Sequence, residues 1–352
     1  SKNFGGIYSS IKFNNFYLDI GCHLFDYTDK EFLNLFEIKS SKILPLTLKY
    51  KSINNYGSTD GYVIYDFRNN PEIKFLQKNF FLNFKKKKPN IKIKNLKELY
   101  VKKYGLFITN IIEKISIKIT GHSLKDINHQ SNQFFMFDRI LLFNTKESLK
   151  LKSNGFNDYL VTQSKYNHDY SKKKIVFTFK NGTKGFIDHI KTLFNKKKIS
   201  FVSKINTKKM NIINPIKENK SATKNSINIP LHLIYLKCKN FPYTYFHDYS
   251  DGPIFRVSSP GFYSNQYKNN ESYICIEIPD PQSKFLKDYL IEYSIKYIEK
   301  YSKAKFFNYF YVSRSYPSIY KNSLKEKNIS YLFDYNKKSI LKNSKKLINE
   351  IK

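Results

Sequence analysis

The order of the predicted elements between residues 175 and 278 constrains the fold more than any other feature of this sequence. Apolar runs typical of strands and an apolar periodicity typical of a helix follow one another there. They predict strands over 175–180, 199–205, 254–257 and 273–278, helices over 183–195 and 260–270, and an extended segment over 227–238. The order strand, helix, strand, strand, helix, strand is that of the ferredoxin-like unit, a four-stranded sheet with both helices on one face. We therefore expect an α+β protein whose central domain, residues 171–280, is a ferredoxin-like βαββαβ domain.

The segments on either side predict two extensions of that domain. Residues 1–150 contain strand patterns over 44–50, 61–67 and 115–119, the last from the alternation of isoleucine with polar residues. Residues 151–170 are polar and indicate a linker. The remainder contains an amphipathic helix pattern over 285–301 and a lysine-rich tail. The sequence thus predicts a strand-rich N-terminal extension over 1–150 and a helical, basic C-terminal extension over 281–352.

The chain contains 62 Lys and Arg residues against 28 Asp and Glu residues, a formal net charge of +34. Lysine, asparagine, isoleucine, tyrosine and phenylalanine share A+T-rich codons, so part of the lysine excess reflects an A+T-rich genome such as that of an organelle or a parasite. A compact monomer with this charge repels itself. We therefore expect a polyanion as its partner.

Several classes of protein are excluded by what the sequence lacks. No stretch of about 18 uncharged apolar residues occurs, so neither a transmembrane helix nor a membrane partner is expected. The first ten residues lack the apolar run of a secretory signal. The cysteines form no C-x-x-C pair and the histidines no H-x-x-x-H pair, so we expect neither a disulfide framework nor a metal site. No G-x-x-x-x-G-K-[ST], G-x-G-x-x-G or G-x-S-x-G motif is present, so no catalytic residues, no cofactor and no enzymatic activity are expected.

Three short motifs follow one another along residues 227–278. They are Ile229-Pro230-Leu231, Arg256-Val257-Ser258-Ser259-Pro260 and Glu271-Ser272-Tyr273. Together with the strand and helix predicted upstream, they resemble the universal small-subunit ribosomal protein ten, the family that includes NusE. The sequence departs from the family at His232, where a proline is usual, and at Gly261, where a histidine is usual. The second helix keeps only Lys268 of the family's basic cluster.

The resemblance implies a structural component in the head of a small ribosomal subunit, in a divergent, mitochondrial form. Its partners would be rRNA and the neighbouring ribosomal proteins of the head, in the mitochondrial matrix. Ile229-Pro230-Leu231 would form a loop that contacts these partners, because Pro230 keeps the chain extended. We expect this loop to be ordered only in the assembled particle.

Lysines cluster at the ends of predicted elements, where they can reach phosphates without disturbing a core. Each phosphate that is neutralised releases counterions, and lysine reads the shape of the backbone rather than the bases. A lysine cluster is also the ordinary composition of a solvated surface. The candidate RNA-binding residues are Lys172, Lys173, Lys174, Lys196, Lys197, Lys198, Lys208 and Lys209, to which the resemblance adds Arg256 and Lys268.

Two alternative functions stay open. The first is a lineage-specific mitochondrial ribosomal or RNA-processing protein without a universal counterpart. The second is a homing endonuclease, because Gly6-Ile7-Tyr8 followed by Tyr17-Leu18-Asp19-Ile20-Gly21 resembles the opening of the GIY-YIG family. Such a nuclease needs an arginine on the helix after the second motif, and the first arginine here is Arg68, next to a strand pattern. The endonuclease is therefore the less favoured alternative.

Overall fold

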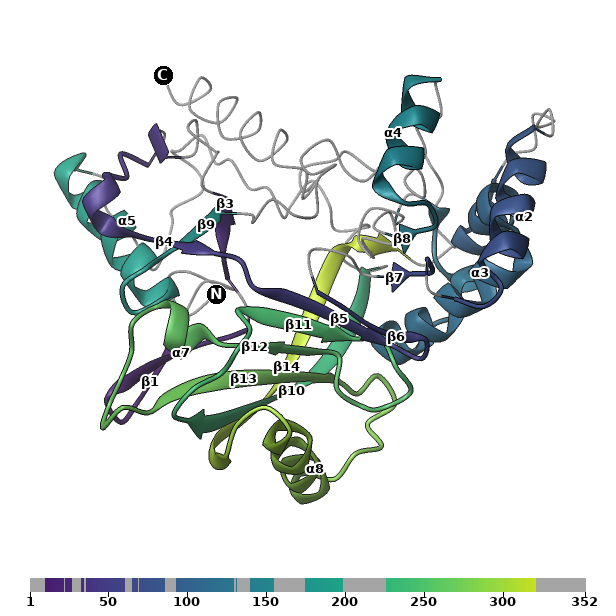
Figure 1. Ribbon diagram of the computed structural model, residues 1–352. Coiled ribbons are helices and arrows are strands. Elements are labelled where there is room, and N and C mark those ends of the chain that lie inside the picture. The colour runs from purple at the N-terminus through teal and green to yellow at the C-terminus, as the bar shows by residue number, and fades with distance from the viewer. Residues whose placement is uncertain are drawn as a thin grey trace, which may run out of the picture.

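The structure of the chain is a computed structural model. It describes residues 10–21, 23–26, 33–34, 36–60, 65–68, 70–85, 93–129, 131, 140–154, 175–198 and 226–320. A large sheet with helices on both faces dominates this part of the chain (Figure 1). None of the helices in these ranges is long and apolar enough to cross a membrane.

Seven strands form the large sheet, in the spatial order β14-β10-β13-β12-β11-β5-β6. They are β5 (Tyr50–Asn54), β6 (Gly57–Asp60), β10 (Ser226–Cys238), β11 (Tyr245–Asp248), β12 (Arg256–Ser258), β13 (Ser272–Pro279) and β14 (Ala304–Tyr320). All neighbours run antiparallel except β5 and β11, which run parallel. The long strands β10 and β13 are rich in β-branched and aromatic residues, which suit a buried sheet.

One face of the large sheet, which we call the outer face, is covered by α8 (Lys287–Glu299). Alternation along β10 directs Ile234 and Leu236 to this face, where they pack with Leu290 and Ile298 of the helix. Leu290 and Ile298 lie on the same side of α8 because eight residues make slightly more than two turns. Figure 1 shows α8 below the sheet.

The opposite face, which we call the inner face, is covered at one end by a hairpin. Its strands are β1 (Ser10–Phe13) and β2 (Phe16–Asp19), which pair antiparallel. Phe16 and Leu18 of the hairpin pack with Tyr235 of β10 and Tyr273 of β13. The hairpin therefore buries the end of the inner face that these aromatic residues form.

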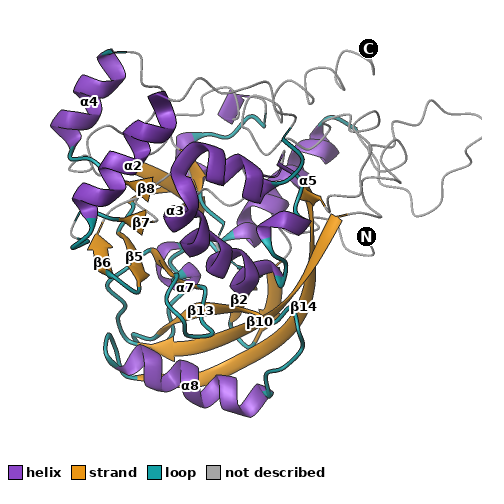
Figure 2. Ribbon diagram, turned by 90° about the vertical axis from the view of Figure 1, so that its right-hand side faces the viewer, coloured by secondary structure: helices purple, strands orange, loops and turns teal. Residues whose placement is uncertain are grey.

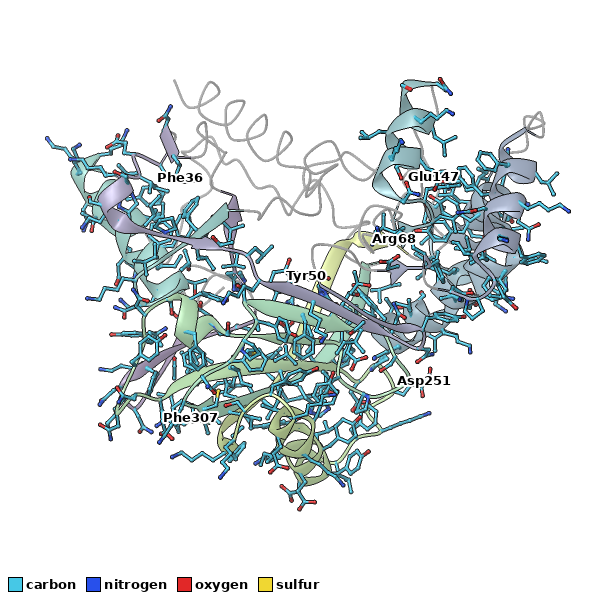
Figure 3. All side chains as sticks on the ribbon, in the orientation of Figure 1. Phe36, Tyr50, Arg68, Glu147, Asp251 and Phe307 are labelled. Atoms are coloured by element: carbon cyan, nitrogen blue, oxygen red, sulfur yellow. The ribbon has the colours of Figure 1, made fainter. Side chains whose placement is uncertain are left out.

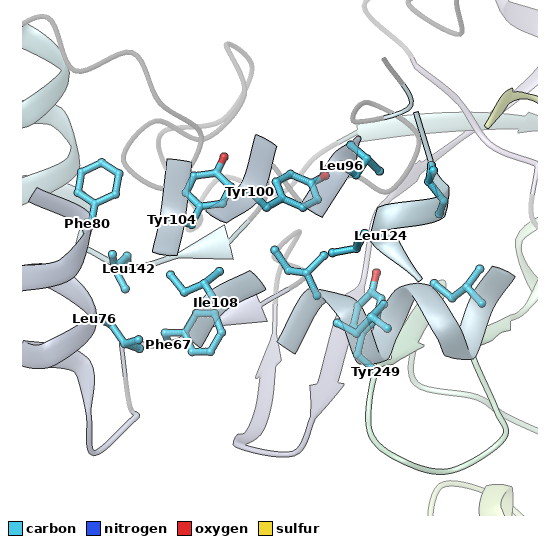
Figure 4. Packing of buried hydrophobic residues seen from close by; sticks show 14 of the residues in the cluster. Phe67, Leu76, Phe80, Leu96, Tyr100, Tyr104, Ile108, Leu124, Leu142 and Tyr249 are labelled. Atoms are coloured by element: carbon cyan, nitrogen blue, oxygen red, sulfur yellow. The ribbon is translucent and has the colours of Figure 1, made fainter. Parts of the chain in front are cut away.

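The other end of the inner face is covered by α2 (Ile73–Lys85) and α3 (Leu96–Thr120), seen in Figure 2. α3 is capped by Asn95, whose side chain accepts a hydrogen bond from the Glu98 amide, and the helix kinks at Gly105, where φ is 80°. Buried residues of both helices form one apolar cluster that extends to β10 (Figure 4); its labelled members are Phe67, Leu76, Phe80, Leu96, Tyr100, Tyr104, Ile108, Leu124, Leu142 and Tyr249.

A second, small sheet lies beyond the hairpin. Its strands are β3 (Phe25–Asp26), β9 (Ile175–Phe179) and β4 (Ile43–Thr47), in that order. Phe186, Ile187 and Ile190 lie on one side of α5 (Thr183–Lys196) and pack on this sheet. The remaining elements are β7 (Tyr65–Asp66), β8 (Ile140–Leu141), α4 (Thr145–Ser153), α7 (Pro260–Tyr263) and the single turns η2 (Ser40–Lys42) and η3 (Leu124–Asp126).

The expectation of a ferredoxin-like βαββαβ domain is wrong. The helix expected over 183–195 is present as α5, but β9 pairs with β3 and β4 whereas β10 to β13 belong to the large sheet. The second expected helix is the single turn α7, and the strand expected over 199–205 lies outside the described residues. Apolar periodicity indicates a strand but not its partner, so it did not reveal that two sheets share these elements.

The expected N-terminal extension also differs at residues 115–119. Their alternation predicts a strand, yet they form the end of α3. Ile112, Ile115 and Ile119 are buried while Ile117 is exposed, which is the spacing of one helical face. An alternation over five residues is too short to exclude a helix, because positions four apart fit both periods.

The expected helical C-terminal extension differs from the structure over residues 304–320, and residues 321–352 lie outside the described residues. The helix expected over 285–301 is present as α8. It is followed by β14, a strand of 17 residues that pairs with β10 along most of its length. The large sheet therefore contains strands from all three expected segments of the chain.

Candidate active site on the inner face

A row of polar side chains crosses the middle of the inner face. Ser52, His247, Arg256 and Glu277 are successive cross-strand neighbours on β5, β11, β12 and β13. Such neighbours point to the same face of a sheet. We call these four residues the polar row. It lies between the apolar cluster under the hairpin and the apolar cluster under α3.

Arg256 and Glu277 form a bidentate ion pair in this row. Nε of Arg256 donates to Oε1 of Glu277 and Nη2 donates to Oε2, both over 2.7 Å. The Glu277 side chain is only 2% exposed and the Arg256 side chain 22%. A carboxylate buried this deeply is tolerated only when it is paired and hydrogen-bonded. The pair fixes a planar guanidinium at the centre of the inner face, a group that suits planar or anionic ligands.

An imidazole next to the ion pair is held by a phenol. The Tyr50 hydroxyl and Nδ1 of His247 lie 2.7 Å apart, and both residues are buried. The ring of Tyr245 packs edge-on against Tyr50, and the ring of Phe255 lies 5.0 Å from the imidazole. Tyr50 lies on β5 in the middle of the molecule (Figure 3). Histidine and tyrosine at hydrogen-bond distance can exchange a proton, which is the requirement for acid–base chemistry.

The strand end that carries His247 is tied to α3 by a buried amine. Nζ of Lys118 donates to the backbone carbonyls of Asp248 and Ser250, over 2.8 and 2.7 Å. Burial lowers the pKa of Lys118 to about 8, although Asp248 and Asp251 act in the opposite direction. The two hydrogen bonds fix the chain immediately after the imidazole.

A buried carboxylate joins the hairpin to α5. Asp19 accepts hydrogen bonds from the backbone amide of Thr183, over 3.1 Å, and from its hydroxyl, over 2.7 Å. Burial raises the pKa of Asp19 to about 7, although both hydrogen bonds from Thr183 lower it. Gly182 leaves the space for this carboxylate, because a Cβ there would lie 2.3 Å from Oδ2 of Asp19. Asp19 therefore occupies the N-terminus of α5, where a negative charge is stabilised.

The lysines expected to bind RNA are only partly described. Lys196, Lys197 and Lys198 are exposed at the end of α5, and the first two pair with Glu37. Lys268 is exposed in the turn before β13. Lys172, Lys173, Lys174, Lys208 and Lys209 lie outside the described residues. Binding of a polyanion by these lysines stays a prediction.

The residues expected to contact partners lie inside the sheet. Ile229 and Leu231 are buried, 1% and 3% exposed, and pack in the cluster under α3. Pro230 lies between them in β10, opposite Ser313 of β14. The segment is therefore a strand of the large sheet and not a loop. Arg256, which the resemblance had added to the RNA-binding residues together with Lys268, is the partner of Glu277.

Sequence reasoning did not single out Tyr50, Ser52, His247 or Glu277. One signal was present, because Glu277 interrupts an otherwise apolar or aromatic strand pattern over 273–278. A charge in the middle of a buried strand requires a partner, and arginine is the residue type best suited to that role. The other three residues lie on short strands whose pairing the sequence does not indicate.

The chain resembles known proteins in its fold and not in its sequence. The sequence matches no protein-family model, and it matches no curated protein. Among solved structures, a reduced UDP-galactopyranose mutase is similar with a TM-score of 0.59 at 12% identity, over 88% of this chain and 75% of that one. A putative protoporphyrinogen oxidase from Exiguobacterium sp. 255-15 is similar with a TM-score of 0.50 at 8% identity, over 87% of this chain and 77% of that one. At these identities the likeness is one of fold.

These likenesses correct the function expected from the sequence. The chain does not have the fold of ribosomal protein ten, and its likeness extends over most of its length to enzymes instead. This likeness of fold contradicts the expected role in a small ribosomal subunit, the expected rRNA and ribosomal-protein partners, and the expectation that the chain is not an enzyme. The alternatives of a lineage-specific ribosomal or RNA-processing protein and of a GIY-YIG endonuclease gain no support. Short motifs in the expected order had suggested the family, but the sheet pairing that defines it is absent.

Proposed function

We propose that the protein is an enzyme of the flavin-dependent oxidoreductase or mutase type, and that the polar row is its reaction surface. The observation that carries the proposal is the position of the row: ionisable side chains are buried at the middle of the inner face, between two apolar clusters. Buried ionisable groups cost stability and concentrate at functional sites. The fold likeness to a UDP-galactopyranose mutase and a putative protoporphyrinogen oxidase supports this type of enzyme.

The residues of the polar row and the neighbouring Tyr50 have separate roles in the proposed reaction. His247 and Tyr50 hold a proton between Nδ1 and the phenol oxygen and pass it to or from a bound substrate. Arg256, held in one orientation by Glu277, positions the substrate. The flanking aromatic rings of Tyr245 and Phe255 exclude water from the imidazole.

A flavin dinucleotide also needs a site for its pyrophosphate, which dinucleotide-binding folds place at a helix N-terminus after a glycine-rich turn. The sequence contains no G-x-G-x-x-G motif. The N-terminus of α5 is occupied by the carboxylate of Asp19, and that of α3 by the side chain of Asn95. Neither of these two helix N-termini therefore fits the pyrophosphate of a flavin dinucleotide, and no step of the reaction is assigned to a flavin.

Flavin binding by the full chain tests the proposal. Flavin-free protein is titrated with FAD, FMN and riboflavin while flavin fluorescence and the thermal unfolding midpoint are followed. FMN and riboflavin are included because they bind without a dinucleotide pyrophosphate. We expect saturable binding of at least one of the three, and binding of none would refute this type of enzyme.

Two histidine variants then test the position of the reaction surface. His247→Ala is expected to change the absorbance of the bound flavin. The matched control is His189→Ala on α5, whose imidazole contacts the carbonyl of Phe36 away from the polar row. Equal spectra for wild type and His247→Ala would place the reaction surface elsewhere, even if a flavin binds.

A further inference from the structure

α2 exposes large apolar side chains on the side turned away from the core. Phe75 is 53% exposed and Leu82 is 49% exposed. They are seven residues apart, so they lie two turns apart on one side of the helix. Leu76 and Phe80, on the opposite side, are buried in the cluster under α3. The packing of α2 on the core therefore leaves a second apolar stripe uncovered.

α3 meets this stripe through Phe107, and the residue before it is exposed as well. Leu106, directly after the kink at Gly105, is 63% exposed. The ring of the next residue, Phe107, lies 6.4 Å from the ring of Phe75 in an edge-to-face arrangement. We call Phe75, Leu82, Leu106 and Phe107 the α2–α3 patch. In Figure 1 these two helices form one side of the molecule, away from α5 and the small sheet.

The charges on α2 itself have one sign, and the exposed Glu72 lies directly before the helix. α2 contains three lysines and no acidic residue. Two of them, Lys74 and Lys78, are exposed, and Lys78 lies between Phe75 and Leu82 in the sequence and on the same side of the helix. The long lysine stems can lie along an apolar surface while their ammonium groups stay in water. The formal net charge of the whole chain is +34.

We propose that the α2–α3 patch docks the protein on an anionic lipid surface. Phenylalanine and leucine on one side of a helix, flanked by lysine, are the composition of helices that lie in the plane of a membrane interface. The apolar side chains enter the boundary between headgroups and acyl chains, and Lys74 and Lys78 contact anionic headgroups. A protein partner with an apolar groove needs no such excess of one charge. The proposal replaces the expectation of no membrane partner, and it is independent of the proposed function.

Vesicle flotation with the full chain tests the proposal. The probes are vesicles of phosphatidylcholine alone and vesicles of phosphatidylcholine with phosphatidylserine. We expect binding to the anionic vesicles and little to the neutral ones. Lys74→Gln/Lys78→Gln is expected to weaken binding by roughly 25-fold, since each lysine near the surface contributes about fivefold.

The apolar side chains are tested by Phe75→Ser/Leu82→Ser/Leu106→Ser, which is expected to abolish binding to the anionic vesicles. Because these side chains are exposed, the substitutions leave the core intact. The matched controls are Leu286→Ser, an exposed leucine before α8, and Lys268→Gln/Lys296→Gln, which removes the same charge elsewhere. Both controls are expected to bind like wild type.

Three results would overturn the proposal. The first is equal binding to neutral and anionic vesicles, and the second is equal loss in the patch variants and their controls. The third is a dimer in sedimentation equilibrium that the triple serine variant dissociates while vesicle binding is absent, because the patch then faces a second copy of the chain.

Discussion

The carboxylate of Asp19 makes the stability of the protein fall as pH rises. Its pKa is about 7 in the folded protein, where it is completely buried, against 3.8 for an ordinary aspartate. Between these values the folded chain keeps the proton that the unfolded chain has released, so each rise in pH favours unfolding. The contribution is fully present below the unfolded pKa and is lost as pH rises to the folded pKa. A difference of about three pKa units amounts to about 4 kcal/mol of unfolding free energy.

Urea unfolding followed by circular dichroism, at pH values from about 4 to 8, measures this dependence. Asp19→Asn has nearly the same shape and stays neutral throughout. The free energy of unfolding of wild type minus that of the variant is expected to fall by about 1.4 kcal/mol per pH unit up to about pH 7, and then to level off. The subtraction cancels the titration of all groups that the two proteins share.

Thr183→Val supplies the control. The hydroxyl of Thr183 lowers the pKa of Asp19, so its removal is expected to extend the fall in stability to higher pH. A difference between wild type and Asp19→Asn that stays flat, or rises, from pH 4 to pH 8 would refute the reasoning.

Three further substitutions test the packing around the site. Gly182→Ala places a methyl group against the Asp19 carboxylate at a positive φ of 62°, and is expected to lower the thermal midpoint, by the equivalent of about 1–3 kcal/mol. Arg256→Met leaves the Glu277 carboxylate buried without its partner, and is expected to cost about 3–5 kcal/mol in urea unfolding, part of which Arg256→Met/Glu277→Leu restores. The pKa of Lys118 is about 8 in the folded protein against 10.5 in the unfolded chain. As pH rises through this interval, the free energy of unfolding of wild type is expected to rise by about 3 kcal/mol relative to that of Lys118→Met. Parallel curves of unfolding free energy against pH would contradict this.

The elements that the sequence predicted well have strong local signals. The pattern over 273–278 is β13, and the amphipathic patterns over 183–195 and 285–301 are α5 and α8. The segment over 227–238 is extended as expected, but it is the buried strand β10 and not a loop that contacts partners. In α5 and α8 the residues that face the core recur at the helical period, whereas β13 is buried on both faces and was indicated by its short apolar and aromatic run.

The pairing of strands and the candidate site were not predictable in the same way. The polar row takes one residue from each of four strands, and β5 comes from a different third of the chain than the others. Ser52 and His247 are neighbours only because β5 pairs in parallel with β11. No local pattern in either short strand indicates which strand it pairs with. The charge of Glu277 was visible in the sequence, whereas its position opposite Arg256 depends on the register of β12 and β13.

The parallel pairing of β5 with β11 also sets an order of events during synthesis. The amide of Lys49, directly before β5, donates to the hydroxyl of Thr244, 195 residues later in the chain. At ribosomal rates, roughly 10 to 40 s separate the emergence of these two segments. The edge of β5 that pairs with β11 in the finished protein therefore stays unpaired until β11 has been synthesised. In the same way, both edges of β10 stay unpaired until β13 and β14 have been synthesised. A nascent chain with strand edges exposed for this long is a natural client for chaperones, and slowing translation before residue 244 would lengthen the exposure of β5 without changing the finished protein.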